Sequence, residues 1–226
     1  RAAGEILARH ERIDVLVNNA GVYLTERRLT GDWIEATWSV NHLAPFLLTN
    51  LLLPRLKMSA PARIVITASD AHRRARIPFD DLDGAKAYAA RSLRGAGYVR
   101  YAQSKLANVL FTVELARRLE GSGVTANCFH PGLVATGISR EHGGLARVAM
   151  KIVDAFSRSP DEGADTLVWL VDSPEVQNVS GAYFAGRRQV EPAVAARDGE
   201  VARRLWDVSE LQTSCGTPAA GPRSDG

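Results

Sequence analysis

Tyr101 and Lys105 have the spacing of a pair that could carry out acid–base chemistry. They lie four residues apart within residues 98–119, whose apolar pattern predicts a helix ending at Gly121 and Gly123. Residues four apart share one face of a helix, so the two side chains can reach the same point. A phenol, with an ordinary pKa of about 10, is a poor acid–base group near neutral pH, but a neighbouring ammonium group lowers that pKa. The pair predicts proton transfer to or from a carbonyl oxygen.

Three predicted strands each lead into residues that suit a ligand site. The strands and the residues that follow or end them are 13–17 with Asn18-Asn19-Ala20-Gly21, 63–69 with Ser69, and 124–129 with Pro131-Gly132. In open parallel sheets, ligands bind beyond the carboxyl ends of the strands. We therefore expect these residues to surround the same ligand as Tyr101 and Lys105.

The rest of the chain alternates between helix and strand. We expect helices over 2–10, 32–57 and 161–171, a last strand over 180–185, and irregular or partly helical stretches over 70–97 and 138–160. In the second helix, Asp32 suits the N-cap and Pro45 a kink. Alternation of this kind predicts an α/β fold with a mainly parallel sheet and helices on both faces. We expect one domain over 1–211 and a disordered tail over 212–226, which is rich in Ser, Thr, Gly and Pro.

Composition narrows the class of protein. The chain has 226 residues, 46% hydrophobic and 23% charged, as is typical of a folded globular protein. Its net charge of +3 comes from scattered residues and not from a basic stripe, so we expect no nucleic-acid partner. Cys128 in an apolar run and Cys215 in the tail indicate a reducing, cytoplasmic setting. No apolar run approaches the ~18 residues of a membrane helix, so we expect no membrane segment in this chain.

The order of the chemistry-bearing residues resembles that of a known enzyme family. Asn18-Asn19-Ala20-Gly21, Asn41, Ser69, Tyr101-Ala-Gln-Ser-Lys105 and Pro131-Gly132 follow one another as in the short-chain dehydrogenase/reductase family. Residues 104–111, 130–132 and 205–209 resemble its retinol dehydrogenase branch. The resemblance implies a Rossmann-like, doubly wound fold. It also implies hydride transfer between a nicotinamide cofactor and a carbonyl or alcohol, on a lipophilic substrate such as a retinoid, steroid or xenobiotic.

The same resemblance implies a role for each catalytic candidate. Tyr101 would be the general acid in reduction and the general base in oxidation, and Lys105 would tune it and bind the nicotinamide ribose. Ser69 would donate a hydrogen bond to the substrate oxygen, as an oxyanion donor does. Asn41, four residues before Pro45, would hold a water in a proton relay to Lys105. The alternative for Asn41 is a polar residue that bends the helix and has no catalytic part.

Two groups of residues would border the cofactor, which is NADP or NAD with NADP favoured by the resemblance. Asn19, Ala20 and Gly21 would line the adenosine side, and Asn18 would tie neighbouring strands together. The nicotinamide and phosphates would be bordered by Pro131, Gly132, Val134 and Thr136.

One part of the family pattern has no counterpart in the sequence. The family opens with a strand, a Gly-rich turn and a helix whose N-terminus binds the pyrophosphate. Gly95-Ala96-Gly97 is no substitute, because it follows a loop and not a strand. We therefore expect the chain to lack the first βαβ portion of the fold, with cofactor binding weakened as a result.

Two alternative functions compete with that of an oxidoreductase. A non-catalytic binding protein of the same fold, or an inactive fragment, would keep the residues without turnover. An α/β hydrolase using Ser69 fails the G-x-S-x-G test, because Ser69 sits in Thr67-Ala68-Ser69-Asp70-Ala71.

The family habit of pairing long helices predicts a homo-oligomer through the apolar residues Leu106, Val109, Leu110 and Val113. We expect no metal site, since His72, His130 and His142 lack ligand spacing and are interpreted as structural.

Overall fold

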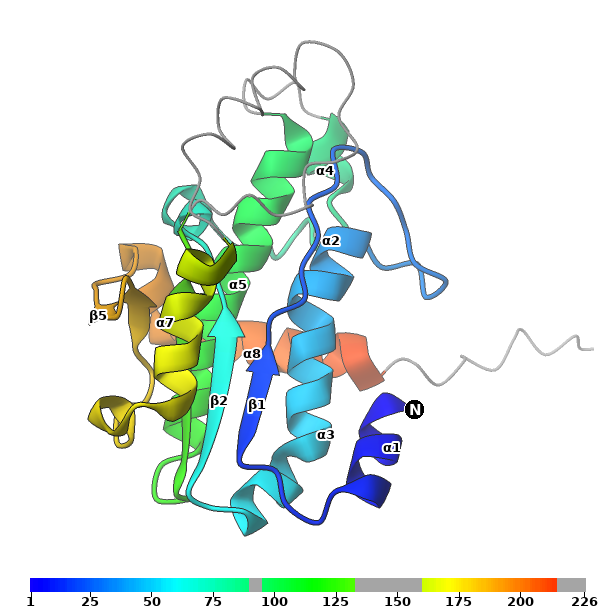
Figure 1. Cartoon of the computed structure of the whole chain (residues 1–226). Helices are drawn as coiled ribbons and strands as arrows, with labels where there is room; N and C mark the ends of the chain where they lie inside the picture. Colours follow the sequence, from blue (N-terminus) through cyan, green and yellow to red (C-terminus); the bar gives the residue numbers. More distant parts are fainter. Residues whose placement is uncertain (90–94, 133–159, 215–226) are drawn as a thin grey trace, which may run out of the picture.

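The computed structural model describes residues 1–89, 95–132 and 160–214, which form one five-stranded sheet with surrounding helices. The strands lie in the order β1 (Val15–Asn18), β2 (Ala62–Thr67), β3 (Val124–His130), β4 (Tyr183–Ala185) and β5 (Arg188–Gln189). The first four are parallel, and β5 returns antiparallel to β4. The Rossmann-like, mainly parallel α/β fold predicted from the sequence is confirmed (Figure 1).

Helical segments precede, connect and follow the strands. In chain order they are α1 (Ala2–Arg9), α2 (Ala36–Trp38), the π-helical turn η1 (Ser39–Leu43), α3 (Ala44–Met58), the 3-10 turn η2 (Asp70–Arg74), α4 (Ala85–Ala89), α5 (Ala96–Arg118), α7 (Pro160–Asp172), the 3-10 turns η4 (Pro174–Val176) and η5 (Val194–Arg197), and α8 (Gly199–Ser214). Figure 1 shows α7 in front of the strands and α5 and α8 behind them. Nearly all of the segment 138–160 lies outside the described residues.

The two faces of the sheet bury alternate residues of the same strand. In β2, Ile64 and Ile66 join the larger core, which includes residues of α3, α5 and α8. Val65, between them, packs in a smaller core with Leu170 of α7. Successive side chains of a strand point to opposite faces, so a strand covered on both sides is apolar at consecutive positions. This explains why residues 64–66 read as an unbroken apolar run.

The predicted helix over 32–57 is interrupted and begins later than expected. Asp32 is not its cap; Glu35 is, because its carboxylate accepts the backbone N–H groups of Thr37 at 3.0 Å and Trp38 at 2.9 Å. The predicted kink takes the form of the π-helical turn η1, directly ahead of Pro45 in the first turn of α3. Proline has no N–H and its ring crowds the carbonyl four residues earlier, which favours an irregular turn at that point.

The C-terminal helix α8 corrects two expectations. It continues to Ser214, so residues 212–214 are helical where the sequence predicted the start of a disordered tail. Trp206 of α8 packs against Phe46 and Phe111, with ring centroids 4.9 and 5.8 Å away, and belongs to the same core as Leu106, Val109 and Leu110. Those three residues are therefore buried within one chain, while Val113, the fourth residue of the predicted interface, is half-buried, so the homo-oligomer stays a prediction.

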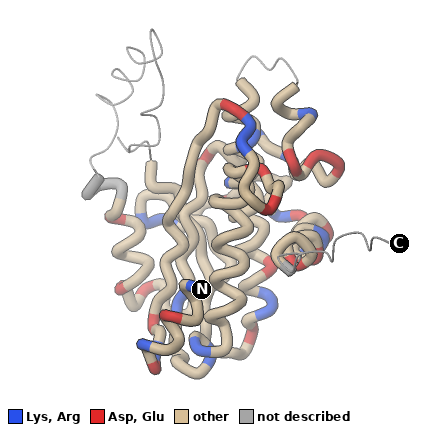
Figure 2. The backbone as a smooth tube through the Cα atoms, turned by 90° about the vertical axis from the view of Figure 1, so that its right-hand side faces the viewer, with Lys and Arg blue, Asp and Glu red and all other residues tan. Residues whose placement is uncertain are grey.

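Charged residues of both signs are interspersed along the backbone in the view of Figure 2. Several form surface pairs, such as Arg27 with Asp83 at 2.8 Å and Arg197 with Glu191 at 2.9 Å. Exposed pairs of this kind contribute little to stability. Within the described part of the chain, no helix combines the length and the apolar character that crossing a membrane requires.

Candidate active site

The four residues predicted to be catalytic come together beyond the carboxyl ends of β1 and β2. Asn41 lies in η1, Ser69 follows β2 and caps η2, and Tyr101 and Lys105 lie one turn apart on α5. Gly21, just after β1, lies close to two of them, Asn41 and Lys105. A Cβ atom there would lie 3.3 Å from Asn41 Oδ1 and 3.4 Å from Lys105 Nζ.

Tyr101 lies near Ser69, the residue expected to share the substrate oxygen with it. Burial raises the pKa of Tyr101, the Ser69 side chain partly offsets that rise, and Tyr98 adds to it. The ring also packs edge-on against Tyr23, with centroids 5.7 Å apart. The phenol is therefore held in its protonated form, ready to donate.

The Lys105 ammonium group turns toward the end of β2 and not toward the Tyr101 hydroxyl. Its Nζ donates to the carbonyl of Thr67 at 2.9 Å and lies 5.7 Å from the centroid of the Tyr101 ring. Burial lowers the pKa of Lys105 to about 8. In this geometry the ammonium group turns toward the end of β2 and burial dominates at the phenol, so the tuning of Tyr101 by Lys105 stays a prediction.

Asn41 connects the loop after β1 to helix α5. Its Oδ1 accepts from Val22 N–H at 2.7 Å, and its Nδ2 donates to Val22 O at 2.9 Å and to Ser104 Oγ at 3.0 Å. Ser104 in turn donates to the Tyr101 carbonyl at 2.7 Å. The side chain is thus fully used in positioning. The backbone carbonyl of Asn41 receives no α-helical hydrogen bond from Pro45, because proline has no N–H. A water relay through this backbone carbonyl stays a prediction.

The first group of predicted cofactor residues follows β1 and is open to solvent. Asn19 and Ala20 are exposed, and Asn19 Oδ1 accepts from Thr67 Oγ1 at 2.8 Å. Asn18 was expected to tie neighbouring strands together. Its buried side chain instead donates to Thr49 Oγ1 of α3 at 2.9 Å, so it fixes a helix against β1.

The second group follows β3. Pro131 and Gly132 come directly after it, and Gly132 has a φ of +85°, which favours glycine. Val134 and Thr136 lie outside the described residues.

Comparison with known proteins decides the family. The family model described as short chain dehydrogenase matches residues 1–90. Human retinol dehydrogenase 14 is 46% identical over 210 residues, covering 92% of this chain and 60% of its own length. Human retinol dehydrogenase 13 is 45% identical, with 92% and 62% covered. The chain belongs to the short-chain dehydrogenase family. It spans about three-fifths of the length of these relatives.

Solved structures share the fold. A protein from Mycobacterium Paratuberculosis is 35% identical with a TM-score of 0.68, covering 94% of this chain and 71% of its own. A short chain dehydrogenase from Burkholderia cenocepacia, solved in complex with NADP, is 27% identical with a TM-score of 0.60, covering 81% and 67%.

A buried ion pair beside this short-chain dehydrogenase site was missed by sequence reasoning. Arg100, the residue before Tyr101, donates to Glu35 at 3.1 Å and to Gln103 at 2.9 Å, and both Arg100 and Glu35 have no exposed surface. Tyr88 also donates to Glu35, at 3.3 Å. The pair joins the cap of α2, which leads to Asn41, to the helix that carries Tyr101. An acidic residue at a helix start was the available signal for Glu35.

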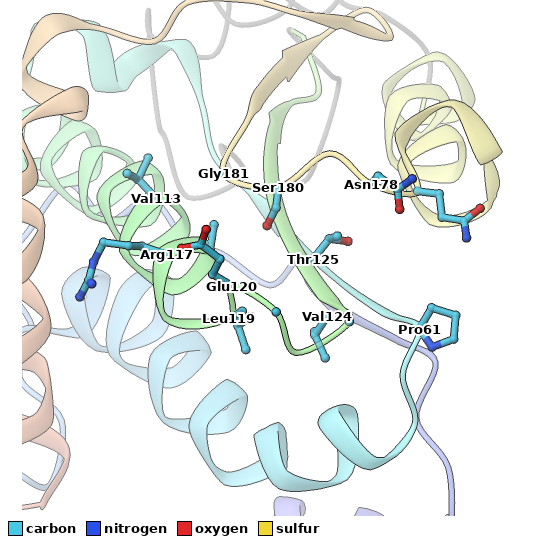
Figure 3. A pocket seen from close by; sticks show the side chains of 14 residues that line it. Pro61, Val113, Arg117, Leu119, Glu120, Val124, Thr125, Asn178, Ser180 and Gly181 are labelled. Atoms are coloured by element: carbon cyan, nitrogen blue, oxygen red, sulfur yellow. The ribbon is translucent and has the colours of Figure 1, made fainter.

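The pocket in Figure 3, of about 570 Å³, lies away from this site. Its walls come from the end of α5, the start of β3 and the loop before β4, with Arg117, Thr125 and Ser180 among the labelled side chains. That is the amino end of the strands, opposite Ser69. No cluster of three metal-ligating side chains occurs among the described residues.

Proposed function

We propose that this chain carries the acid–base machinery of an NAD(P)-dependent oxidoreductase that interconverts a carbonyl and an alcohol. The observation that carries the proposal is the meeting of Ser69, Tyr101 and Lys105 beyond the carboxyl end of β2. Membership of the short-chain dehydrogenase family supports it.

Each residue has one task in carbonyl reduction. Ser69 donates a hydrogen bond to the substrate oxygen and stabilises the negative charge that grows there. Tyr101, whose raised pKa keeps it protonated, gives its proton to the same oxygen. With a pKa of about 8, Lys105 is mostly cationic at neutral pH and stabilises the phenolate left behind. In oxidation the proton moves the opposite way, from alcohol to Tyr101.

The residues around Gly21 suit a nicotinamide cofactor, which supplies or accepts the hydride when bound. A Cβ atom at Gly21 would crowd Asn41 Oδ1 at 3.3 Å and touch Lys105 Nζ at 3.4 Å, so the position suits a residue without a side chain. Asn19 and Ala20 would extend this wall, and Pro131 and Gly132 would form the other. Lys105 would hold the ribose hydroxyls.

NADP is proposed over NAD, and a lipophilic aldehyde or alcohol such as a retinoid is proposed as substrate. The NADP complex of the related Burkholderia cenocepacia protein supports the first choice. The relatives named retinol dehydrogenase support the second. The competing function is a binding protein of the same fold that holds cofactor without turnover.

The test is reduction of retinal with NADPH or NADH, followed by nicotinamide absorbance in the protein that carries these residues. We expect faster turnover with NADPH and formation of one alcohol per cofactor oxidised. Ser69→Ala should lower kcat by about 10²- to 10³-fold, the effect of removing an oxyanion donor. Ser122→Ala, at the opposite end of the sheet, should not. Cofactor binding without turnover of any aldehyde, ketone or alcohol would favour the binding protein.

A further inference from the structure

His72 is a fully buried histidine whose two ring nitrogens both have partners. Nδ1 lies 2.7 Å from the Ser69 carbonyl oxygen, and Nε2 accepts the backbone N–H of Ala193 at 3.1 Å. A carbonyl oxygen can only accept, so Nδ1 carries the proton. A peptide N–H can only donate, so Nε2 carries the lone pair. The imidazole is therefore neutral and held in a single tautomer.

The partner that matters is the Ser69 peptide. Its carbonyl accepts twice from His72, from the ring at 2.7 Å and from the backbone N–H at 3.1 Å. Its side-chain Oγ accepts the backbone N–H of Ala71 at 3.2 Å, which leaves the hydroxyl hydrogen to be donated elsewhere. These contacts hold both the carbonyl and the hydroxyl oxygen of Ser69, the proposed donor to the substrate oxygen.

Contacts around His72 connect the segment after β2 to the ends of β3 and β4. Its ring packs edge-on against Tyr183 of β4 at 4.9 Å. Tyr183 donates to Asp70 at 2.9 Å, Arg73 donates to the same oxygen of Asp70 at 3.1 Å, and His130 of β3 lies 3.7 Å from the other oxygen. The Ser69 turn is thus tied to β3, β4 and the segment before η5.

We propose that His72 is a positioning residue that orients the Ser69 hydroxyl toward the substrate oxygen. The inference rests on the proposed function, because it assigns His72 to the donor used there. His72 contacts neither substrate nor cofactor; it acts through the Ser69 carbonyl. The bond to Ala193 keeps the lone pair on Nε2 and hence the proton on Nδ1, facing Ser69.

Three substitutions separate the two bonds. In His72→Asn, an amide nitrogen takes the place of Nδ1 and keeps the donor to Ser69. In His72→Gln, the amide reaches only the Nε2 position and keeps the contact with Ala193. In His72→Phe, the ring remains but both hydrogen bonds are lost. His72→Phe and His72→Gln should lower kcat by about tenfold to a hundredfold, as expected for misplacing a catalytic group, with little change in cofactor KM. His72→Asn should retain most of the wild-type kcat.

The double variant tests the route of action. If His72 works through Ser69, adding His72→Phe to Ser69→Ala should change kcat by no more than about twofold. A further loss of the full His72→Phe factor in that background would overturn the positioning role. Wild-type kcat in His72→Phe beside a crippled Ser69→Ala would also overturn it, whereas full activity of Ser69→Ala would overturn the proposed function itself.

Nitrogen NMR of the wild-type protein tests the same inference without turnover and without a variant that must fold. The His72 spectrum should place the proton on Nδ1 at neutral pH. A proton on Nε2 would contradict the hydrogen bonds to Ser69 and Ala193 and overturn the proposal.

Discussion

His42 should make this fold sensitive to mild acid. Its ring is fully buried among Trp38, Phe46 and Phe111. Ser209 gives its only hydrogen to the Leu205 carbonyl at 2.7 Å, so His42 Nε2–H donates to Ser209 at 2.8 Å. Burial lowers the pKa of His42 from 6.5 to about 3, opposed in part by Asn108.

The sign and size of the effect follow from linkage. The folded-state pKa is below the unfolded-state value, so as pH falls below 6.5 the unfolded chain takes up a proton that the folded chain refuses. The stability present above pH 6.5 is therefore lost progressively as pH falls toward 3. At pH 5, about 1.5 pH units below the unfolded-state pKa, the loss from this residue is about 2 kcal/mol.

Urea unfolding at pH 7 and pH 5 measures this loss, with His42→Gln as the matched control. Gln can keep a hydrogen bond to Ser209 but does not titrate, so other groups change alike in both proteins. We expect the free energy of unfolding to fall by about 2 kcal/mol more in the wild type than in the variant. Equal pH dependence in the two proteins would refute the reasoning.

Three further predictions concern packing around the site. Glu35→Gln and Arg100→Met should each lower the free energy of unfolding by about 3–5 kcal/mol, since each leaves a buried charge unpaired, and the double variant should lose less than the sum in denaturant titrations. Gly97→Ala would place a Cβ atom against the Leu24 carbonyl oxygen and should destabilise by about 1–3 kcal/mol, whereas Gly4→Ala, with open space, should not; equal thermal midpoints would contradict this close approach. Trp206→Ala should cost about 3–5 kcal/mol by opening a cavity between α8 and α5, and a cost below about 1 kcal/mol would mean that α8 is not seated as described.

Much of the fold was predictable because local patterns agree with the tertiary structure. The apolar run over 64–66 and the helix that carries Tyr101 are determined by neighbouring residues. The helix α8 was missed because its apolar positions, such as Leu205, make sense only against α5. Its last turn was assigned to a tail by composition, yet Gln212 accepts a hydrogen bond from Trp38 at 3.0 Å. A contact across 174 residues cannot be read from local sequence.

The meeting of the candidate residues was predictable from the sequence, but their electrostatics were not. The order of motifs identified Asn41, Ser69, Tyr101 and Lys105, and strand ends explain why they meet. The direction of the Tyr101 pKa depended on burial and on where the Lys105 ammonium turns, neither of which spacing determines. His72 was interpreted as structural because it lacks metal-ligand spacing, and its partners in the structure are backbone groups, which leave no motif in the sequence.

The central claim is that Tyr101 transfers the proton, and one measurement tests it most directly. Steady-state kcat for NADPH-dependent reduction of retinal is compared in Tyr101→Phe and in Tyr98→Phe, a matched loss of a hydroxyl three residues earlier on α5. Tyr101→Phe should lose about 10²- to 10⁴-fold, the usual contribution of general acid–base catalysis, while Tyr98→Phe stays near wild type. A Tyr101→Phe enzyme with wild-type kcat would contradict the account.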